Sequence, residues 1–489
     1  MPRRRTAAGG DAADATRPPS EVFARSGSAS ADLDPAHYFE ALYTADEMRS
    51  AEERYPGYPE SIPELMERAG GAVAREARSA YPDARRFACV CGGGSNGGDG
   101  RVAARVLGEA GLEAEVTEDV EGYDVVVDAL FGTGFRGEPR AEAAALIQRI
   151  NAAGAPVVSV DLPSGVDAST GEVAGAVVDS DLTVTFHAAK VGLAIAPGRF
   201  HAGRVVVAEI GLEERETEHR LATPGLLDLV PLRSAGDTKY TAGAVLVVGG
   251  QPGMTGAACL SALAALRADA GYVTVAVPVE SLPVIETLAL EPVKVGWTEE
   301  SALETIAAVA ERAGSLALGP GLGRGEARRA LVRDLLQTVE LPAVVDADAL
   351  DGFEPVERSA PTVLTPHAGE LARLLDTGSD WVGAHRLEAA RSAAERFRAI
   401  VLLKGPDTIV AAPSGGADVC GLGPPSLATA GTGDVLTGIL GAFLAKGLDA
   451  RTAAAAAAVA HARAAELVPH RAGLVAGDLL HALPAALER

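Results

Sequence analysis

Apolar positions along the chain follow two patterns that alternate from end to end. Short strand-like runs occur at 87–91, 124–128 and 157–161 in the first half and at 244–248 and 272–277 in the second, and their length suits strands buried on both faces. The segments between them have helical spacing, as where Leu65, Ala69, Val73 and Ala77 form one apolar face. Strands that alternate with helices predict an α/β fold with helices on both faces of parallel sheets.

The length of the chain and its punctuation divide it into two parts. A chain of 489 residues exceeds what one hydrophobic core usually organises, and the charged, proline-punctuated stretch 213–233 has no clear sheet pattern. We therefore expect two doubly wound, three-layer α/β domains, 39–215 and 234–489, joined by a linker at 216–233. Residues 1–38 lack periodic apolar positions and are predicted to be a disordered tail.

Charge and cysteine content narrow the possible partners. The chain has 43 Lys and Arg against 66 Asp and Glu, a formal net charge of -23, which repels nucleic acid and anionic membranes. The four cysteines have no metal-binding or disulfide spacing, and the alanine-rich run 452–459 is too short and weakly apolar to span a bilayer. We expect a cytoplasmic protein that binds neither nucleic acid nor membrane.

The stretch 428–438 near the C-terminus is the clearest candidate for chemistry. Gly431 and Gly433 permit a turn in which successive amides converge on an anion at the start of a helix. Asp434 follows directly, and a carboxylate beside a phosphate cradle suits a general base that takes a proton from the attacking group. The alternative is an ordinary glycine-rich helix cap with Asp in the first turn.

Polar residues also follow three strands of the first half. A glycine-rich loop, 92–100, separates the first strand from a helical pattern at 102–107, while Asp128 and Asp161 end the next two strands. Because carboxyl ends of parallel strands share one edge of a sheet, Asn96, Asp128, Asp161 and Ser164 are expected to converge there. Such oxygen ligands suit a hard cation or a proton-transfer carboxylate beside one. Simple helix capping by each Asp is the alternative.

Four motifs give the first half a specific resemblance. The sequences at 96–100, 128–134, 161–167 and 185–190 together resemble the NAD(P)H-hydrate epimerase domain, over about 42–212. This resemblance implies a Rossmann-like fold, with Asp161 at the substrate and potassium held by Asn96, Asp128 and Ser164. Ser95 stands where the family commonly has Asn. The residues implied to hold the hydrated nucleotide are Ser95, Asn96, Gly97, Gly98, Asp99, Gly132, Thr133, Gly134, Phe135, Arg136, Gly137, Glu138 and Asp161.

The second half resembles another family, through the loops at 318–323, 345–350, 365–370 and 403–408 that precede the turn at Asp434. Their order is similar to that of the ribokinase-like superfamily, and within it to ADP- or ATP-dependent NAD(P)H-hydrate dehydratase, over about 234–483. Vitamin kinases of this superfamily often have Asn where His367 stands, which favours the dehydratase. The resemblance implies a hydrate site at Ala257, Gly321, His367 and Asp434, and an adenine-nucleotide site at Lys404, Gly405, Pro406, Asp407, Thr408 and Gly433.

Together the two resemblances identify a bifunctional NAD(P)H-hydrate repair enzyme. They imply that the first half interconverts the R and S hydrates, NADHX or NADPHX, and that the second dehydrates the S form at the expense of ADP or ATP, with magnesium at the phosphates. Asp161 and Asp434 would be catalytic, and we expect a homo-oligomer. A small-molecule kinase fused to a nucleotide-binding module, or a scaffold without catalysis, are the alternatives.

Overall fold

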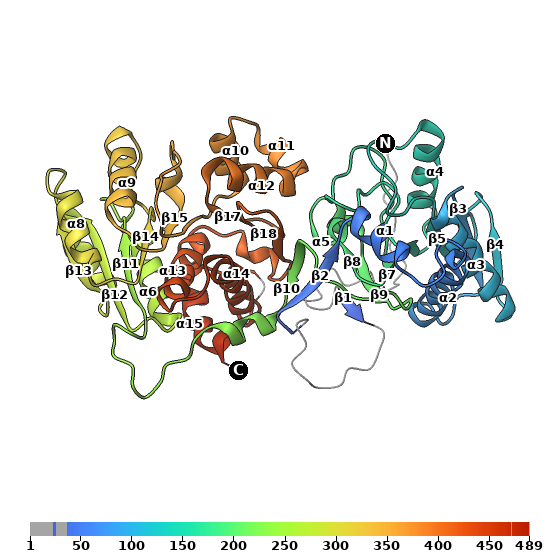
Figure 1. Cartoon of the computed structure of the whole chain (residues 1–489), viewed down its shortest axis with the longest axis horizontal. Helices are drawn as coiled ribbons and strands as arrows, with labels where there is room; N and C mark the ends of the chain where they lie inside the picture. Colours follow the sequence, from blue (N-terminus) through green and yellow to red (C-terminus); the bar gives the residue numbers. More distant parts are fainter. Residues whose placement is uncertain (1–22, 26–36, 471, 489) are drawn as a thin grey trace.

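The computed structural model describes residues 23–25, 37–470 and 472–488 and consists of two α/β halves placed end to end (Figure 1). The first half contains a seven-stranded sheet of order β1-β9-β7-β6-β5-β3-β4, and every neighbouring pair in it is parallel. Its strands are β1 (Phe23–Arg25), β3 (Arg86–Cys91), β4 (Glu113–Val116), β5 (Val125–Ala129), β6 (Val157–Val160), β7 (Leu182–Phe186) and β9 (Arg204–Ala208).

Helices cover both faces of this sheet because successive strand residues point to opposite sides. Phe87 and Cys89 of β3 pack in one core with α2 (Ile62–Ala80) and α3 (Ser95–Glu109). Their neighbours Ala88 and Val90 pack on the other side with α4 (Ala141–Ala152). The half is completed by α1 (Ala45–Glu53), the short α5 (Val191–Ala194) and the 3-10 helix η3 (Gly198–His201). The doubly wound, Rossmann-like prediction is confirmed.

The start of α3 differs from the prediction. We expected a glycine-rich loop through residue 100 and a helix from 102, but α3 begins at Ser95. A Cβ added at Gly97 would lie 2.0 Å from the Gly92 carbonyl oxygen, and one at Gly100 would lie 2.5 Å from the Ala129 Cβ. These glycines therefore let the first turns of α3 lie directly against β3 and β5, which a glycine count alone does not reveal.

The second half repeats the architecture around a larger sheet, in which β13 through β17 are parallel and β17, β18 and β19 are antiparallel. Val245 and Val247 of β11 face one helical layer, and Leu246 and Val248 face the other. In spatial order the strands are β13 (Val293–Trp297), β12 (Tyr272–Pro278), β11 (Ala244–Val248), β14 (Ser315–Leu318), β15 (Ala343–Val345), β16 (Thr362–Leu364), β17 (Ile400–Leu403), β18 (Thr408–Ala411) and β19 (Ala417–Cys420).

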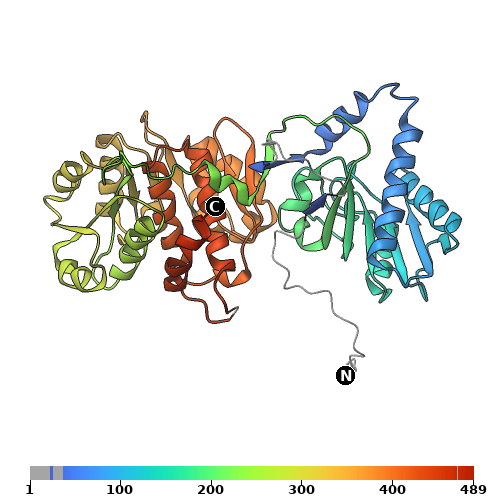
Figure 2. The ribbon, with the colours of Figure 1, turned by 90° about the horizontal axis from the view of Figure 1, so that it is seen from below.

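Two groups of helices enclose this sheet. One layer contains α6 (Thr255–Arg267), α13 (Thr432–Ala445), α14 (Ala450–Glu466) and α15 (Ala476–Leu487), with α7 (Leu282–Leu288) at its margin. The other contains α8 (Ala302–Ala310), α9 (Glu326–Thr338), α10 (Ala368–Leu375), α11 (Ser379–Ala384) and α12 (Arg386–Phe397). Figure 2 shows the same two-layered arrangement from below. Within the described residues, no helix is both long and apolar enough to cross a membrane.

The segment predicted as a linker, 216–233, contains regular structure. Its strand β10 (His219–Ala222) pairs with β19 of the second half and with β2 (Phe39–Tyr43) of the first, and β2 pairs with β8 (Ala189–Lys190). A 3-10 helix, η4 (Pro224–Leu229), follows. The larger sheet therefore has twelve strands and continues across the junction of the two halves.

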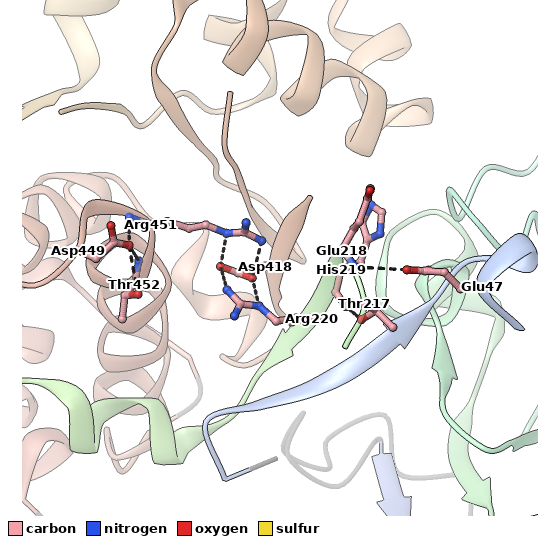
Figure 3. A network of polar contacts seen from close by, with 9 residues as sticks. All are labelled: Glu47, Thr217, Glu218, His219, Arg220, Asp418, Asp449, Arg451 and Thr452. Carbon is pink, nitrogen blue, oxygen red and sulfur yellow. Dashed lines mark hydrogen bonds and ion pairs between the residues drawn. The ribbon is translucent and has the colours of Figure 1, made fainter. Parts of the chain in front are cut away.

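Ion pairs reinforce this junction (Figure 3). Asp418 of β19 is buried and accepts hydrogen bonds from Arg220 of β10 and Arg451 of α14 at 2.7–3.1 Å. A buried carboxylate is costly unless it is paired in this way. The β10 strand is thus held to the second half by an ion pair as well as by its pairing with β19.

The predicted N-terminal tail falls almost wholly outside the described residues. Within it, Phe23–Arg25 form β1, which pairs in parallel with the edge strand β9. An open strand edge offers main-chain hydrogen-bond partners even to a sequence without an apolar pattern, so periodicity does not predict β1.

Candidate functional sites

The first site lies at the carboxyl edge of three neighbouring strands, β3, β5 and β6. As the sequence predicts, parallel pairing brings Asn96, Asp128, Asp161 and Ser164 to this one edge. Asp128 and Ser164 are fully buried, and Asn96 and Asp161 are nearly so. We call this group, together with the 132–138 loop, the first site.

Asp128 is the centre of a compact hydrogen-bond cluster. Its two carboxylate oxygens accept from the Ser164 hydroxyl at 2.6 Å, the Ser164 amide at 2.9 Å, the Ser159 hydroxyl at 2.8 Å and the Leu130 amide at 3.3 Å. All four donors are uncharged, and burial raises the pKa of this carboxyl despite them. A carboxylate in that position is stabilised by a nearby cation.

Asn96 and Ser164 are joined to this cluster through the chain that follows β5. The Asn96 side-chain amide donates to the Phe131 carbonyl at 2.9 Å, and the Phe131 amide donates to the Ser164 hydroxyl oxygen at 2.9 Å. A Cβ added at Gly132 would lie 2.9 Å from Asn96 Oδ1, so a larger residue there would collide with the side chain of Asn96. A chain of hydrogen bonds through neutral groups therefore links Asn96, Phe131 and Ser164 to one buried carboxylate.

Asp161 has an ion-pair partner that the sequence analysis did not assign. Its Oδ1 lies 2.8 Å from Lys190 Nζ and accepts from the Thr185 hydroxyl at 3.0 Å. Lys190 is fully buried, and its ammonium also donates to Thr185 and to the Phe186 and Ala188 carbonyls. Asp161 has a positive φ of 67°, an uncommon backbone conformation that is often found at functional positions.

Two further carboxylates face Asp161. Burial, with the negative charges of Asp161 and Glu52, raises the pKa of Asp99 to about 8. The pKa of Glu52, on α1, is also raised, by burial and then by Asp161. Asp99 therefore carries a proton at neutral pH and can act as a hydrogen-bond donor or an acid. Glu52 lies in α1, outside every sequence motif, so the sequence analysis did not include it.

The 132–138 loop lies over the same edge. The ring of Phe135 stacks on Phe131 with centroids 4.7 Å apart, and Arg136 lies 3.8 Å from Asp46 of α1. These contacts connect the loop to α1 on the side where Glu52 lies. The loop also contains the predicted substrate residues Gly132, Thr133, Gly134, Gly137 and Glu138, while Ser95, Gly97 and Gly98 form the first turn of α3.

The second site is centred on Asp434, in the first turn of α13. Gly431, with φ 90°, caps this helix, so the turn favours glycine there as predicted. Gly433 was expected to share this role, but it lies inside α13 without a positive φ. Burial and the charge of Asp346 raise the pKa of Asp434 to about 7, while Lys404 opposes the shift. A pKa near neutrality suits a general base.

Asp346 and Lys404 form the charged floor of this site. Lys404 Nζ lies 2.8 Å from Asp346 Oδ1, and the Thr437 hydroxyl donates to Asp346 Oδ2 at 2.7 Å. Lys404 lowers the pKa of Asp346 against the effect of burial. A Cβ placed on Gly433 would be 3.4 Å from Lys404 Nζ, so the ammonium lies directly beside the helix start. The amides of that turn and the Lys404 ammonium can receive one phosphate together.

His367 begins α10 and lies beside Lys404 in the adjacent strand position. Its Nδ1 accepts from the Gly369 amide at 3.0 Å, and Glu370 accepts from the His367 amide at 2.9 Å. The histidine is therefore a helix cap, the plainer interpretation of a lone His. Its Nε2 lies 3.6 Å from Glu370 Oε1, and 57% of the side chain is exposed.

The predicted nucleotide loop, 404–408, does not expose all of its side chains. Asp407 is fully buried, its Oδ1 is 2.9 Å from Arg386 Nε, and the Arg386 guanidinium donates to the Asp407 carbonyl at 2.6 Å. A Cβ at Gly405 would lie 2.4 Å from an Arg386 nitrogen. Asp407 thus holds the loop from within the protein, whereas Lys404 faces the second site.

Ala257 and Gly321 are brought together as predicted. They lie on α6 and on the loop after β14, and a Cβ at Gly321, where φ is 62°, would be 3.3 Å from the Ala257 Cβ. The Gln251 amide donates to the Gly321 carbonyl at 2.7 Å and joins the two loops. The Ser261 hydroxyl, on the same helix, donates to the Asp434 carbonyl at 2.7 Å, so α6 is also attached to the turn that contains Asp434.

Lys190 and Asp346 are the main residues that the sequence analysis left without a role, although both lie in motifs that it singled out. Asp346 directly follows β15, as Asp161 follows β6, so its position at a strand end could have indicated a role in the site. Lys190 ends the 185–190 motif, but no local pattern indicates that its ammonium reaches back to Asp161.

Comparison with known proteins agrees with this division into two sites. Residues 245–488 match the family described as NAD(P)H-hydrate dehydratase, and residues 63–120 and 114–192 match the family described as YjeF-related protein N-terminus. Among curated relatives, the bifunctional NAD(P)H-hydrate repair enzyme Nnr of Moorella thermoacetica is 39% identical over 486 residues, covering 86% of this chain and 92% of the relative. The Escherichia coli enzyme of the same name is 35% identical, covering 86% and 88%.

A solved structure resembles the second half. The crystal structure of ADP/ATP-dependent NAD(P)H-hydrate dehydratase from Bacillus subtilis, crystallised with ATP and Mg²⁺, is 29% identical to this chain with a TM-score of 0.50. It covers 54% of this chain and 96% of its own length. The similarity agrees with the ribokinase-like fold expected for that half.

Proposed function

Because the chain belongs to the family of bifunctional NAD(P)H-hydrate repair enzymes, we propose that each of its two sites carries one of the two repair reactions. The enzyme interconverts the R and S forms of NAD(P)H hydrate and dehydrates the S form back to NAD(P)H, with conversion of ADP to AMP and phosphate or with the corresponding use of ATP. Epimerisation belongs to the first site and dehydration to the second, in domains 39–215 and 234–489.

In the first site, Asp161 is the proton-transfer group. Inversion of the hydroxyl-bearing carbon requires that protons be moved to and from the hydrated ring, and Asp161 is held for this by Lys190 at 2.8 Å and by Thr185. The protonated Asp99 provides a second acid on the same side. The first turn of α3 and the 132–138 loop bind the nucleotide part of the hydrate through main-chain amides and through the side chains predicted for this role.

The chemistry of the Asp128 cluster fits a potassium ion. One carboxylate with a raised pKa and several neutral oxygens give low net charge and no nitrogen or sulfur ligand, which suits a large monovalent cation better than a divalent one. Asn96, Asp128 and Ser164 would hold it. Bound there, potassium would supply the positive charge that the Asp128 carboxylate lacks among its hydrogen-bond donors.

In the second site, Asp434 removes the proton from the hydrate hydroxyl as its oxygen attacks the terminal phosphoryl group of ADP or ATP. The bond from that phosphorus to the bridging oxygen breaks, and AMP or ADP leaves. Loss of phosphate from the phosphorylated hydrate, together with a proton from the adjacent ring carbon, then restores the double bond of the dihydropyridine. The amides at Gly433 and the Lys404 ammonium stabilise the charge on the transferred group.

The other predicted residues of the second site fall into two groups. Ala257, Gly321 and His367 hold the hydrate, and residues 404–408 hold the nucleotide. Magnesium would accompany the phosphates, where it would offset their repulsion from the carboxylates of Asp434 and Asp346. The observation that carries the assignment is the pKa of about 7 for Asp434 beside the Lys404–Asp346 pair. The substrates are small molecules, so the proposed reactions require no particular oligomeric state. We nevertheless expect a homo-oligomer.

Substitution Asp434→Asn tests this assignment, because the amide is nearly isosteric but cannot accept the proton. We expect dehydration to fall by at least about a hundredfold, while epimerisation without nucleotide stays unchanged. Products of the wild-type reaction with ADP should be one AMP and one phosphate for each reduced nicotinamide formed. A dehydration rate within about tenfold of wild type, equivalent to ~1.4 kcal/mol, would overturn the base assignment. Accumulation of a stable phosphorylated product would indicate a kinase instead.

A further inference from the structure

The first half of the molecule touches the nucleotide loop of the second half. After the short helix α5, the chain of the first half passes beneath residues 404–408, and there the Ala196 amide lies 3.4 Å from the buried carboxylate Oδ2 of Asp407. Arg199, in η3, reaches the same loop. Two residues far from the loop in sequence therefore hold it from the side of the epimerase domain.

The Arg199 guanidinium bridges two main-chain carbonyls of the second half. One nitrogen donates to the Pro406 carbonyl at 3.1 Å and the other to the Gly421 carbonyl at 2.6 Å. Pro406 precedes β18 and Gly421 follows β19, so the bridge joins the two open ends of one hairpin. Burial lowers the pKa of Arg199, and a desolvated guanidinium forms strong, directional hydrogen bonds.

These contacts fix the orientation of the peptide planes in the 404–408 loop. The carbonyl oxygen and the following amide of a trans peptide point in opposite directions. Arg199 fixes the Pro406 carbonyl and therefore also the direction of the Asp407 amide. Arg386, from the second half, fixes the next carbonyl, that of Asp407, at 2.6 Å. Two consecutive peptide planes of the loop are thus held by arginines from two different domains.

We propose that Arg199, a residue of the epimerase domain, is a positioning residue for the adenine nucleotide of the dehydratase reaction. This rests on the proposed function, in which the 404–408 loop binds ADP or ATP. The guanidinium does not contact the reacting atoms. It keeps the loop in its nucleotide-binding shape, so binding of nucleotide depends on the other domain.

The test uses full-length protein with Arg199→Met, which keeps most of the unbranched apolar stem of the side chain but removes its donors. We expect the KM for ADP and ATP to rise on the order of tenfold, because a small displacement of positioning groups costs about that much or more. The kcat at saturating nucleotide should stay within about threefold, and epimerisation should be unchanged. Arg199→Lys, which can still donate to one carbonyl, should give an intermediate KM.

Two controls separate this proposal from its alternatives. Arg220→Met removes another arginine of the junction, one that contacts Asp418 and not the loop (Figure 3), and should leave the nucleotide KM unchanged. Thr408→Val alters the loop itself and should raise it. If Arg220→Met raises the KM as much as Arg199→Met, or if only Thr408→Val raises it, the role of Arg199 is refuted. If neither Arg199→Met nor Thr408→Val changes the KM, the 404–408 loop does not bind the nucleotide, and the proposed role of Arg199 is refuted with it.

Discussion

At the scale of single residues, the second site depends on a carboxylate whose environment makes it a base at neutral pH. Burial and Asp346 raise the pKa of Asp434, and Lys404 limits the shift, to about 7. Without Lys404 the pKa of Asp434 would be higher and the carboxyl would hold its proton more tightly. Without burial its pKa would be lower and the carboxylate would be too weak a base. In the proposed reaction, the Lys404–Asp346 pair therefore sets the pKa of Asp434 as well as binding phosphate.

A pH dependence of dehydration follows from that pKa. Because the base acts only when deprotonated, kcat for dehydration should fall about tenfold per pH unit below 7 and level off above it. The measurement is the initial rate of nicotinamide recovery at saturating hydrate and nucleotide, from about pH 5.5 to pH 8.5. The Asp434→Asn variant provides the control, since its residual rate should lose this inflection. A wild-type profile that is flat through neutral pH would contradict the account.

At the scale of elements, α3 shows how glycine spacing serves two purposes. Gly97 lies at the start of the helix, where an added Cβ would lie 2.0 Å from the Gly92 carbonyl, whereas Gly108, near its end, has no neighbour within 4 Å of that position. The two glycines belong to one helix and both adopt negative φ. The difference between them that matters here is which atoms surround the position of an added Cβ.

This difference gives a matched pair of substitutions. Gly97→Ala should destabilise the protein by about 2 kcal/mol or more, because the backbone must move to admit the methyl group, and should impair epimerisation as well. Gly108→Ala should stabilise it by up to ~1 kcal/mol through helix propensity. Chemical denaturation followed by circular dichroism measures both. Equal effects of the two substitutions would mean that close packing at Gly97 is not what glycine provides there.

How far the sequence predicts these elements depends on whether the signal is local. Apolar runs located the strands that flank both sites, and strand ends located Asp128 and Asp161, because side-chain periodicity and parallel pairing are general rules. The early start of α3 escaped prediction because glycine favours loops in isolation and is helical here only through packing on β3 and β5. The same limit applies to β10, whose pairing with β2 and β19 is tertiary, and to Lys190, whose partner Asp161 directly follows another strand, β6.

At the scale of the whole molecule, the two halves should respond to different cations. The neutral ligands around Asp128 predict that epimerisation requires potassium, while dehydration requires magnesium with the nucleotide. Exhaustive exchange of potassium for a bulky organic cation should slow epimerisation strongly, and re-addition should restore it. Hydrate inversion, followed by chromatography without nucleotide, is the measurement. Full epimerase activity after exchange would count against a potassium site at Asn96, Asp128 and Ser164.

The junction connects the two halves structurally, and the two halves also act on the same pool of hydrates. A twelve-stranded sheet crosses it, and the Arg220–Asp418–Arg451 cluster fixes the crossing strand (Figure 3). The first site is linked to the nucleotide loop through Lys190, the helix that follows it and Arg199. We expect one chain to repair both hydrate epimers because epimerisation at Asp161 would supply the S form for dehydration at Asp434.

The most direct test of that claim follows the recovery of reduced nicotinamide absorbance from a mixture of R and S hydrates with ADP or ATP. Wild-type protein should recover both epimers in one fast phase. Asp161→Ala should recover the S hydrate at the wild-type rate and leave the R hydrate to its slow uncatalysed inversion, which gives a biphasic curve. If the variant still recovers both epimers in a single fast phase, Asp161 is only a structural residue or the first half is not an epimerase, and the account is wrong.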